Sequence, residues 1–150
     1  MMRRLLSLLA LAASVSCVSA EPFIPTIETT NFASSLGVDL AASTKTPSGM
    51  YYRNIIVGGG AQVPDTGHTS VSVTYAGYFR NGAMFDSGND LFTTNNGDRI
   101  AGYNEGILGM KVGGSRQLII PPALAYGSQG YGSIGPNQIL VFTVTLTAIH

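Results

Sequence analysis

The sequence has few of the residues on which most nucleophilic, histidine-based and metal sites depend. It contains one cysteine, Cys17, and two histidines, His68 and His150. A single cysteine excludes an intrachain disulfide. Because His68 falls in a predicted turn and His150 is the last residue, we expect neither a histidine-based triad nor a histidine-rich metal site. No serine lies in a Gly-x-Ser-x-Gly pattern. We therefore expect no cofactor and no metal.

Charge and long hydrophobic runs are also scarce. Charged residues make up 11% of the chain and balance to a formal net charge of +0, so the sequence shows no basic footprint for nucleic acid. No stretch reaches the roughly 18 apolar residues of a membrane-spanning helix. The hydrophobic fraction of 45% is nevertheless enough for a packed core. The 19 glycines indicate many turns rather than long helices.

The first 20 residues have the three-part pattern of a secretory signal peptide. Arg3 and Arg4 give a basic start, Leu5–Ala13 is a short apolar stretch, and Val18–Ala20 offers small residues for cleavage. We therefore predict an exported protein, either periplasmic or secreted. Cys17 leaves a second route open, because a lipidated cysteine at this place would make a lipid-anchored envelope protein.

Residues 21–48 are rich in threonine, serine and alanine and contain three prolines. This composition is typical of a linker or a short N-terminal arm, with one helical turn expected within residues 31–40. A spacer and a dimerising arm fit the composition equally well.

Alternating hydrophobic and polar residues dominate the chain from residue 49 onward. This period of two predicts β-strands with one buried face. The predicted strands cover residues 50–57, 69–79, 115–120 and 139–149. One short helix is expected at residues 104–110, ended by Gly113 and Gly114. Since it is the only cover available for a one-faced sheet, we expect the sheet to curl around it.

Aromatic residues are the remaining chemical resource of this region. They are Tyr75, Phe79, Phe85, Phe92, Tyr103, Tyr126, Tyr131 and Phe142. A simple aromatic core explains them, but buried tyrosines need hydrogen-bond partners. An aromatic-lined concavity that holds a proline ring or another apolar group explains them as well.

Several motifs resemble those of the FKBP-type peptidyl-prolyl cis-trans isomerases. Residues 73–78 and 84–87, VTYAGY and MFDS, are similar to the family's VHYTG and FDSS. Residues 100–106, IAGYNEG, look like VIPGWDEG, and residues 109–127 are close to GMKVGGKR followed by IPPELAYG. Residues 136–142 resemble the closing PNATLVF. The resemblance runs in the family's order from about Thr46 to the C-terminus.

This resemblance implies an α+β fold, in which a five- or six-stranded antiparallel β-sheet wraps around one short α-helix in a domain covering residues 49–150. It implies an isomerase that rotates X-Pro bonds in exported or folding polypeptides. Matching positions give the catalytic residues as Tyr75, Phe85, Asp86, Tyr126 and Phe142. They give the substrate-binding residues as Phe92, Ile100, Tyr103, Tyr131 and Ile134. In this scheme the Tyr126 hydroxyl and the Ile134 amide hold substrate carbonyls, and Asp86 organises hydrogen bonds at the twisted amide.

Two departures from the family pattern bear on rate and ligand choice. Tyr103 stands where the family usually has tryptophan, and Arg99 replaces an expected valine. They keep open a proline-peptide-binding module or chaperone with little catalysis. A third alternative, well behind these, is a structural envelope protein whose linker mediates assembly. The expected partners are unfolded or flexible proline-containing polypeptides and macrolide inhibitors of the tacrolimus type. We expect no nucleic acid, and membrane contact only if Cys17 is lipidated.

Overall fold

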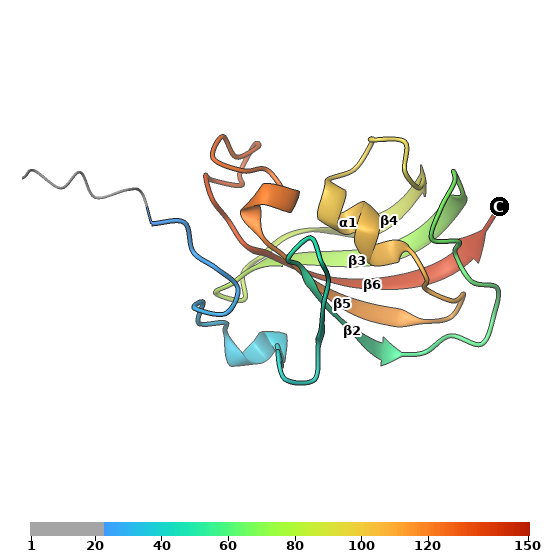
Figure 1. The fold of residues 1–150 in the computed structure, drawn as a ribbon, viewed down its shortest axis with the longest axis horizontal. Helices are drawn as coiled ribbons and strands as arrows, with labels where there is room; N and C mark the ends of the chain where they lie inside the picture. Colours follow the sequence, from blue (N-terminus) through green and yellow to red (C-terminus); the bar gives the residue numbers. More distant parts are fainter. Residues whose placement is uncertain (1–22) are drawn as a thin grey trace, which may run out of the picture.

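A computed structural model describes residues 23–150, in which six antiparallel strands curve around one helix (Figure 1). The strand order is β1-β2-β5-β6-β3-β4. The strands are β1 (Thr44–Lys45), β2 (Tyr51–Ile56), β3 (Ser70–Phe79), β4 (Met84–Thr93), β5 (Ser115–Ile120) and β6 (Leu140–Ile149). The helix is α1 (Ala101–Ile107), and short 3-10 turns lie at η1 (Ser34–Leu36) and η2 (Pro122–Leu124). The predicted α+β class, with its sheet wrapped around a short helix, is confirmed. The predicted signal peptide and Cys17 lie outside the described residues.

The four strands predicted from alternation are present as β2, β3, β5 and β6, each within one or two residues of its expected ends. One detail of β6 differs from the expectation. The pairing of β3 with β6 shifts register between Ser72 and Val73, and a bulge of this kind changes which side chains face the core. As a result Ile149, rather than Ala148, packs against the main core cluster.

Strand β4 could not be read from hydrophobic alternation. Its sequence, MFDSGNDLFT, carries four polar residues and a glycine at its centre, and these residue types are depleted in strands. It forms because it pairs along its length with β3, from Ser70 opposite Thr93 to Gly77 opposite Asp86. The pairing places Asp86, Asp90 and Phe92 on one face of the strand, two and four residues apart.

Helix α1 begins three residues earlier than expected and ends three residues earlier. Gly102 and Gly106 lie inside it and are buried, because a side chain at either position would overlap Ile120 or Leu118 of the sheet. The chain leaves the helix at Leu108, and Gly109 takes a positive φ of 72°. Gly109, not Gly113 and Gly114, therefore ends the helix.

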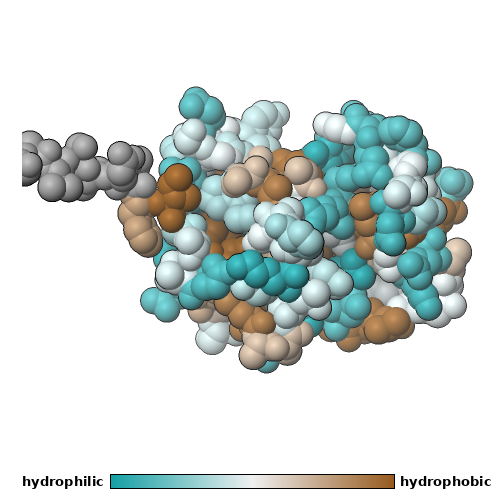
Figure 2. All heavy atoms as spheres, viewed as in Figure 1, coloured by the Kyte–Doolittle hydropathy of each residue, from teal (hydrophilic) through white to brown (hydrophobic). Residues whose placement is uncertain are grey.

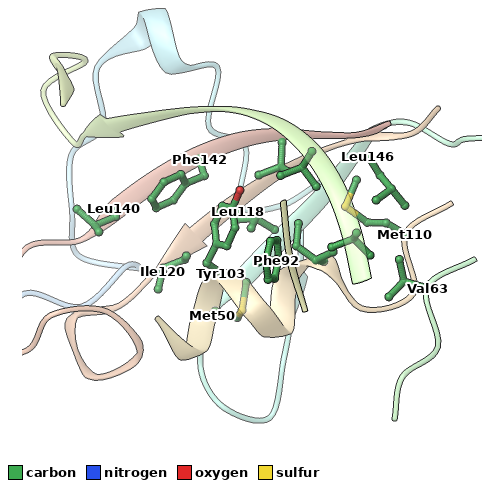
Figure 3. Close-up of a cluster of buried hydrophobic side chains, with 14 of the residues drawn as sticks. Met50, Val63, Phe92, Tyr103, Met110, Leu118, Ile120, Leu140, Phe142 and Leu146 are labelled. Carbon is green, nitrogen blue, oxygen red and sulfur yellow. The ribbon is translucent and has the colours of Figure 1, made fainter. Parts of the chain in front are cut away.

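The sheet is buried on both faces, so the prediction of a single buried face is wrong. The concave face holds the main core against α1, where Phe92, Tyr103, Leu118 and Phe142 meet (Figure 3). On the opposite face a second cluster forms from Tyr51, Ile119, Ile139 and Val141 under Ile27. Phe32, Leu36, Val38 and Leu40 pack against this cluster.

Residues 23–48 supply that second cover, and strand β1 within them pairs with β2. Of the two readings left open for this segment, the packing favours an arm over a free linker. The expected helical turn is present as η1. Its role as a spacer or dimerising element stays a prediction.

Hydrophilic residues cover much of the face shown in Figure 2. On the face shown in Figure 2, hydrophobic residues form small groups separated by hydrophilic ones. No helix among residues 23–150 is long and apolar enough to cross a membrane.

Candidate functional site

One cleft brings together most of the residues predicted to form the site. It opens beside the start of α1, between β3, β4 and the loop that follows η2, and has a volume of about 570 Å³. We call it the aromatic cleft. Its lining residues are Tyr75, Phe85, Asp86, Asp90, Gly97, Asp98, Arg99, Ile100, Tyr103, Tyr126, Tyr131 and Phe142. Eight of the ten residues predicted for the site therefore meet in one concavity.

The walls of the aromatic cleft are built from interlocking rings. Phe142 of β6 packs edge-on against Phe85 of β4 at 5.5 Å and against Tyr103 of α1 at 5.2 Å between ring centroids. Tyr75 of β3 meets Tyr103 at 6.1 Å. These distances and edge-to-face angles are those preferred by aromatic pairs.

Gly77 allows this close packing of rings. A side chain at this position would place its Cβ 2.6 Å from Phe85 Cζ and 2.8 Å from Phe142 Cε1. The glycine of the VTYAGY motif is thus required by the two rings that lie over it.

The hydroxyl of Tyr75 fixes the carboxylate of Asp86. It donates a hydrogen bond of 2.8 Å to Asp86 Oδ2, while Asp86 Oδ1 accepts a bond from the backbone N–H of Ser87. Burial and the hydrogen bond to Asp86 raise the pKa of Tyr75 to about 12. The phenol therefore stays protonated and keeps the carboxylate oriented at the edge of the aromatic cleft.

Tyr103 forms the floor and brings a polar atom into it. The side chain is only 4% exposed, and its hydroxyl has no hydrogen-bond partner within residues 23–150. Burial is the main reason why the pKa of Tyr103 is raised, with the negative charge of Asp90 adding to it. Figure 3 shows the ring rising from α1 toward the sheet between Phe142 and Phe92.

Tyr126 and Tyr131 make the rim opposite α1. Their rings stack at 5.3 Å with an interplanar angle of 15°. Burial raises the pKa of Tyr126, so its hydroxyl stays protonated and can donate a hydrogen bond over the physiological pH range. No hydrogen bond among residues 23–150 engages this hydroxyl, which leaves it available to a ligand carbonyl.

Two predicted site residues do not line the aromatic cleft. Phe92 is 5% exposed and lies behind Tyr103, with 5.7 Å between the ring centroids. Ile134 is buried in the rim loop, where its backbone N–H donates to the Tyr131 carbonyl at 2.9 Å. Since this donor is already bonded within a tight turn, the structure gives no support to the expected role of the Ile134 amide in holding a substrate carbonyl, and that role stays a prediction.

The backbone of Ile100 offers the donor that Ile134 does not. Ile100 lines the aromatic cleft as the residue preceding α1, and its N–H makes no hydrogen bond in the described part of the chain, whereas its carbonyl accepts from Tyr103 and Asn104. The first N–H groups of a helix have no intrahelical partners. A helix predicted to start after Ile100 would therefore have identified this N–H as a free donor from the sequence.

The sequence also missed an ion pair in the wall. Arg99 Nε donates to Asp90 Oδ2 at 2.8 Å, and Nη2 contacts Oδ1 at 2.5 Å. Asp90 is two residues from Phe92 and four from Asp86. Once β4 is known to be a strand, this even spacing places Asp90 on the same face as both residues. Within residues 23–150 no group of three or more histidine, cysteine or carboxylate side chains is placed to hold a metal ion.

Comparison with known proteins places this geometry in a family. The model of the FKBP-type peptidyl-prolyl cis-trans isomerase family matches residues 61–147. A probable FK506-binding protein of Corynebacterium glutamicum is 46% identical over 105 residues, covering 67% of this chain and 86% of that protein. FK506-binding protein 4 of Dictyostelium discoideum is 44% identical over 106 residues, which are 68% of this chain and 29% of that protein. The match thus spans less than a third of the longer relative.

Two solved structures share the fold. The crystal structure of AtFKBP13 has a TM-score of 0.67 and 30% sequence identity, covering 72% of this chain and 98% of that one. FkpA from Escherichia coli has a TM-score of 0.63 and 33% identity, covering 72% of this chain and 51% of that one.

Proposed function

Because the chain belongs to the family of FKBP-type peptidyl-prolyl cis-trans isomerases, we propose that it accelerates rotation about X-Pro peptide bonds. The observation that carries the proposal is the aromatic cleft, in which four aromatic rings surround a space suited to a proline ring. Its edge carries the oriented carboxylate of Asp86. The Tyr126 hydroxyl and the Ile100 N–H lie in the same cleft and have no hydrogen-bond partner in the described structure.

The reaction needs no proton transfer and no nucleophile. Cis and trans X-Pro bonds differ by only about 0.5–1 kcal/mol, but amide resonance sets a barrier of about 18–20 kcal/mol between them. An enzyme accelerates rotation by binding the twisted amide more tightly than either planar form. Twisting removes the conjugation, so the carbonyl loses negative charge and the nitrogen becomes pyramidal. An apolar cleft that excludes water disfavours the more polar planar amide.

One group of cleft residues binds the proline ring of the substrate, and another binds its backbone carbonyls. Tyr75, Phe85, Tyr103 and Phe142 hold the proline ring and exclude water from it. The Tyr126 hydroxyl and the Ile100 N–H donate to carbonyl oxygens on either side of the rotating bond. Asp86, oriented by Tyr75, accepts hydrogen bonds at the twisted unit. Holding the flanking carbonyls turns binding energy into torsion about the bond between them.

The substrates we propose are unfolded or flexible proline-containing polypeptides in an exported compartment. The signal peptide predicted for residues 1–20 supports a periplasmic or secreted location, and lipidation of Cys17 would place the domain on a membrane surface. Macrolides of the tacrolimus type are proposed as weak competitors for the same cleft, since the relatives are described as FK506-binding proteins.

The test is the cis-to-trans rate of a chromogenic X-Pro peptide with the purified wild-type protein, the Asp86→Ala variant and the Tyr126→Phe variant. We expect acceleration by the wild type and a loss of about tenfold or more in kcat/KM for each variant, the size typical of a lost transition-state hydrogen bond. Asp39→Ala serves as a matched control, because Asp39 lies in the arm and is exposed.

Absence of acceleration by folded wild-type protein would refute the isomerase proposal. If such a sample still bound proline peptides, the alternative of a binding module or chaperone would take its place, and Tyr103 and Arg99 would be the first residues to replace. Equal activity of all variants would refute the residue roles while leaving the activity intact.

A further inference from the structure

The side chain of Arg99 is held in the wall of the aromatic cleft by three hydrogen bonds. Two of them run to the carboxylate of Asp90, in the bidentate form that matches a guanidinium to a carboxylate. The third runs from Nη1 to the carbonyl of Asp98 at 2.9 Å. Because Asp90 is itself fixed in β4 opposite Val73, Arg99 is anchored to the sheet rather than free in solvent.

Arg99 covers the ring of Phe92. Its Cζ lies 5.5 Å from the ring centroid, within the range of a cation–π contact. Arg99 and Asp90 both line the aromatic cleft, whereas Phe92 does not. The guanidinium thus separates Phe92 from the space that a ligand enters, and the apolar wall ends at Tyr103.

The ion pair makes this end of the cleft costly to cover with apolar groups. The side chain of Asp90 is 15% exposed and that of Arg99 is 37% exposed, so both groups still contact water. A ligand that places hydrocarbon over them removes this water without supplying hydrogen bonds, and a charged pair is penalised for such desolvation. A proline ring held among Tyr75, Phe85 and Phe142 leaves the pair hydrated.

We propose that Arg99, clamped by Asp90, is a specificity-determining residue that closes the Phe92 end of the aromatic cleft to large apolar groups. The cleft then accepts a single prolyl unit in an extended peptide and discriminates against bulky apolar ligands such as macrolides of the tacrolimus type. This inference rests on the proposed function for its substrate, but ligand binding tests it separately from catalysis.

The experiment measures, by calorimetry, the Kd of a tacrolimus-type macrolide and of a short Ala-Pro peptide for the wild type and for the double variant Arg99→Val, Asp90→Asn. The ratio of macrolide affinity to peptide affinity is expected to rise about tenfold in the double variant, because it uncovers Phe92 and removes both charges of the pair, whereas Arg99→Val alone would leave the Asp90 carboxylate unpaired in the wall. Asp90→Asn, which loosens the clamp but keeps Arg99, is expected to raise the same ratio by a smaller factor.

Arg80→Val is the matched control, since Arg80 is exposed and lines a different surface depression; its ratio should equal that of the wild type. A thermal melt of each variant verifies that it is folded, and Arg99→Gln combined with Asp90→Asn, which also removes both charges, replaces the first double variant if that one is not folded. An unchanged or lower ratio in a folded double variant would overturn the inference. A protein that binds both ligands as predicted but shows no isomerase activity would refute the proposed function and leave this inference standing.

Discussion

Removing one hydroxyl from each of two neighbouring tyrosines should change stability in opposite directions. Tyr103 buries a hydroxyl that has no partner in the described structure, and the free-energy cost of such a group is about 1–3 kcal/mol. Tyr103→Phe removes the oxygen and leaves the ring in place. Because part of the gain is lost to the small void that remains, we expect the free energy of unfolding to rise by about 1 kcal/mol.

Tyr75→Phe is the matched substitution, since the two rings are 6.1 Å apart in the same aromatic cleft. Its hydroxyl donates to Asp86 at 2.8 Å. Asp86 is exposed, so water replaces the lost donor and the expected fall in the free energy of unfolding is only about 0.5–1 kcal/mol.

Urea unfolding monitored by circular dichroism measures both variants under the same conditions. A gain of about 1 kcal/mol in a domain of this size corresponds to a rise of several degrees in Tm. If Tyr103→Phe lost stability by as much as Tyr75→Phe, the Tyr103 hydroxyl would have a partner, and the reasoning that reads it as an unsatisfied group would be refuted.

Three further substitutions test how the scaffold positions the site. Arg116 is 7% exposed and donates hydrogen bonds to the carbonyls at the end of α1. Arg116→Ala should therefore lower the free energy of unfolding, measured in urea, by about 3 kcal/mol. A loss below about 1 kcal/mol would contradict this role. Gly106→Ala should lower the free energy of unfolding by about 1–3 kcal/mol despite the better helix propensity of alanine, because the added methyl group overlaps Leu118. A stabilised variant in the same urea assay would show that the helix can move away from Leu118. The pKa of Glu28 is lowered to about 2, mainly by the hydrogen bond from Lys45. A lowered folded-state pKa adds stability above the unfolded value of about 4.3 that is lost as pH falls toward 2. The urea midpoint should therefore fall over that interval by a small amount that Glu28→Gln abolishes, since the pair is exposed. An identical pH profile for the variant would show that this pair, which joins two parts of the arm, adds nothing to stability.

The strands that could be predicted from the sequence are those whose alternate side chains all face the same core. Alternation along β3 and β6 located both strands because their inward positions, such as Val71, Val73, Val144 and Leu146, all contribute to one core. The family motifs then placed eight site residues in one cleft, because aromatic residues far apart in sequence occupy fixed positions on this sheet and helix.

The remaining features depend on partners that the local sequence does not contain. Strand β4 is held by its pairing with β3 rather than by its own propensity. The arm reads as a linker until the second cluster under Ile27 is seen. Arg99 could be recognised as a departure from the family, but its hydrogen bonds to Asp90 required the register of β4 and the start of α1 to be known.

The most direct test of the account is the cis–trans exchange rate of an X-Pro peptide, measured by NMR exchange spectroscopy in the presence of a catalytic amount of the purified protein. This measurement needs no coupled protease and reports rotation of the bond itself. The account predicts exchange between the two isomers that is much faster than the uncatalysed process, which takes tens to hundreds of seconds, and that is suppressed by Asp86→Ala. An exchange rate equal to that of the free peptide, with folded protein present, would contradict it.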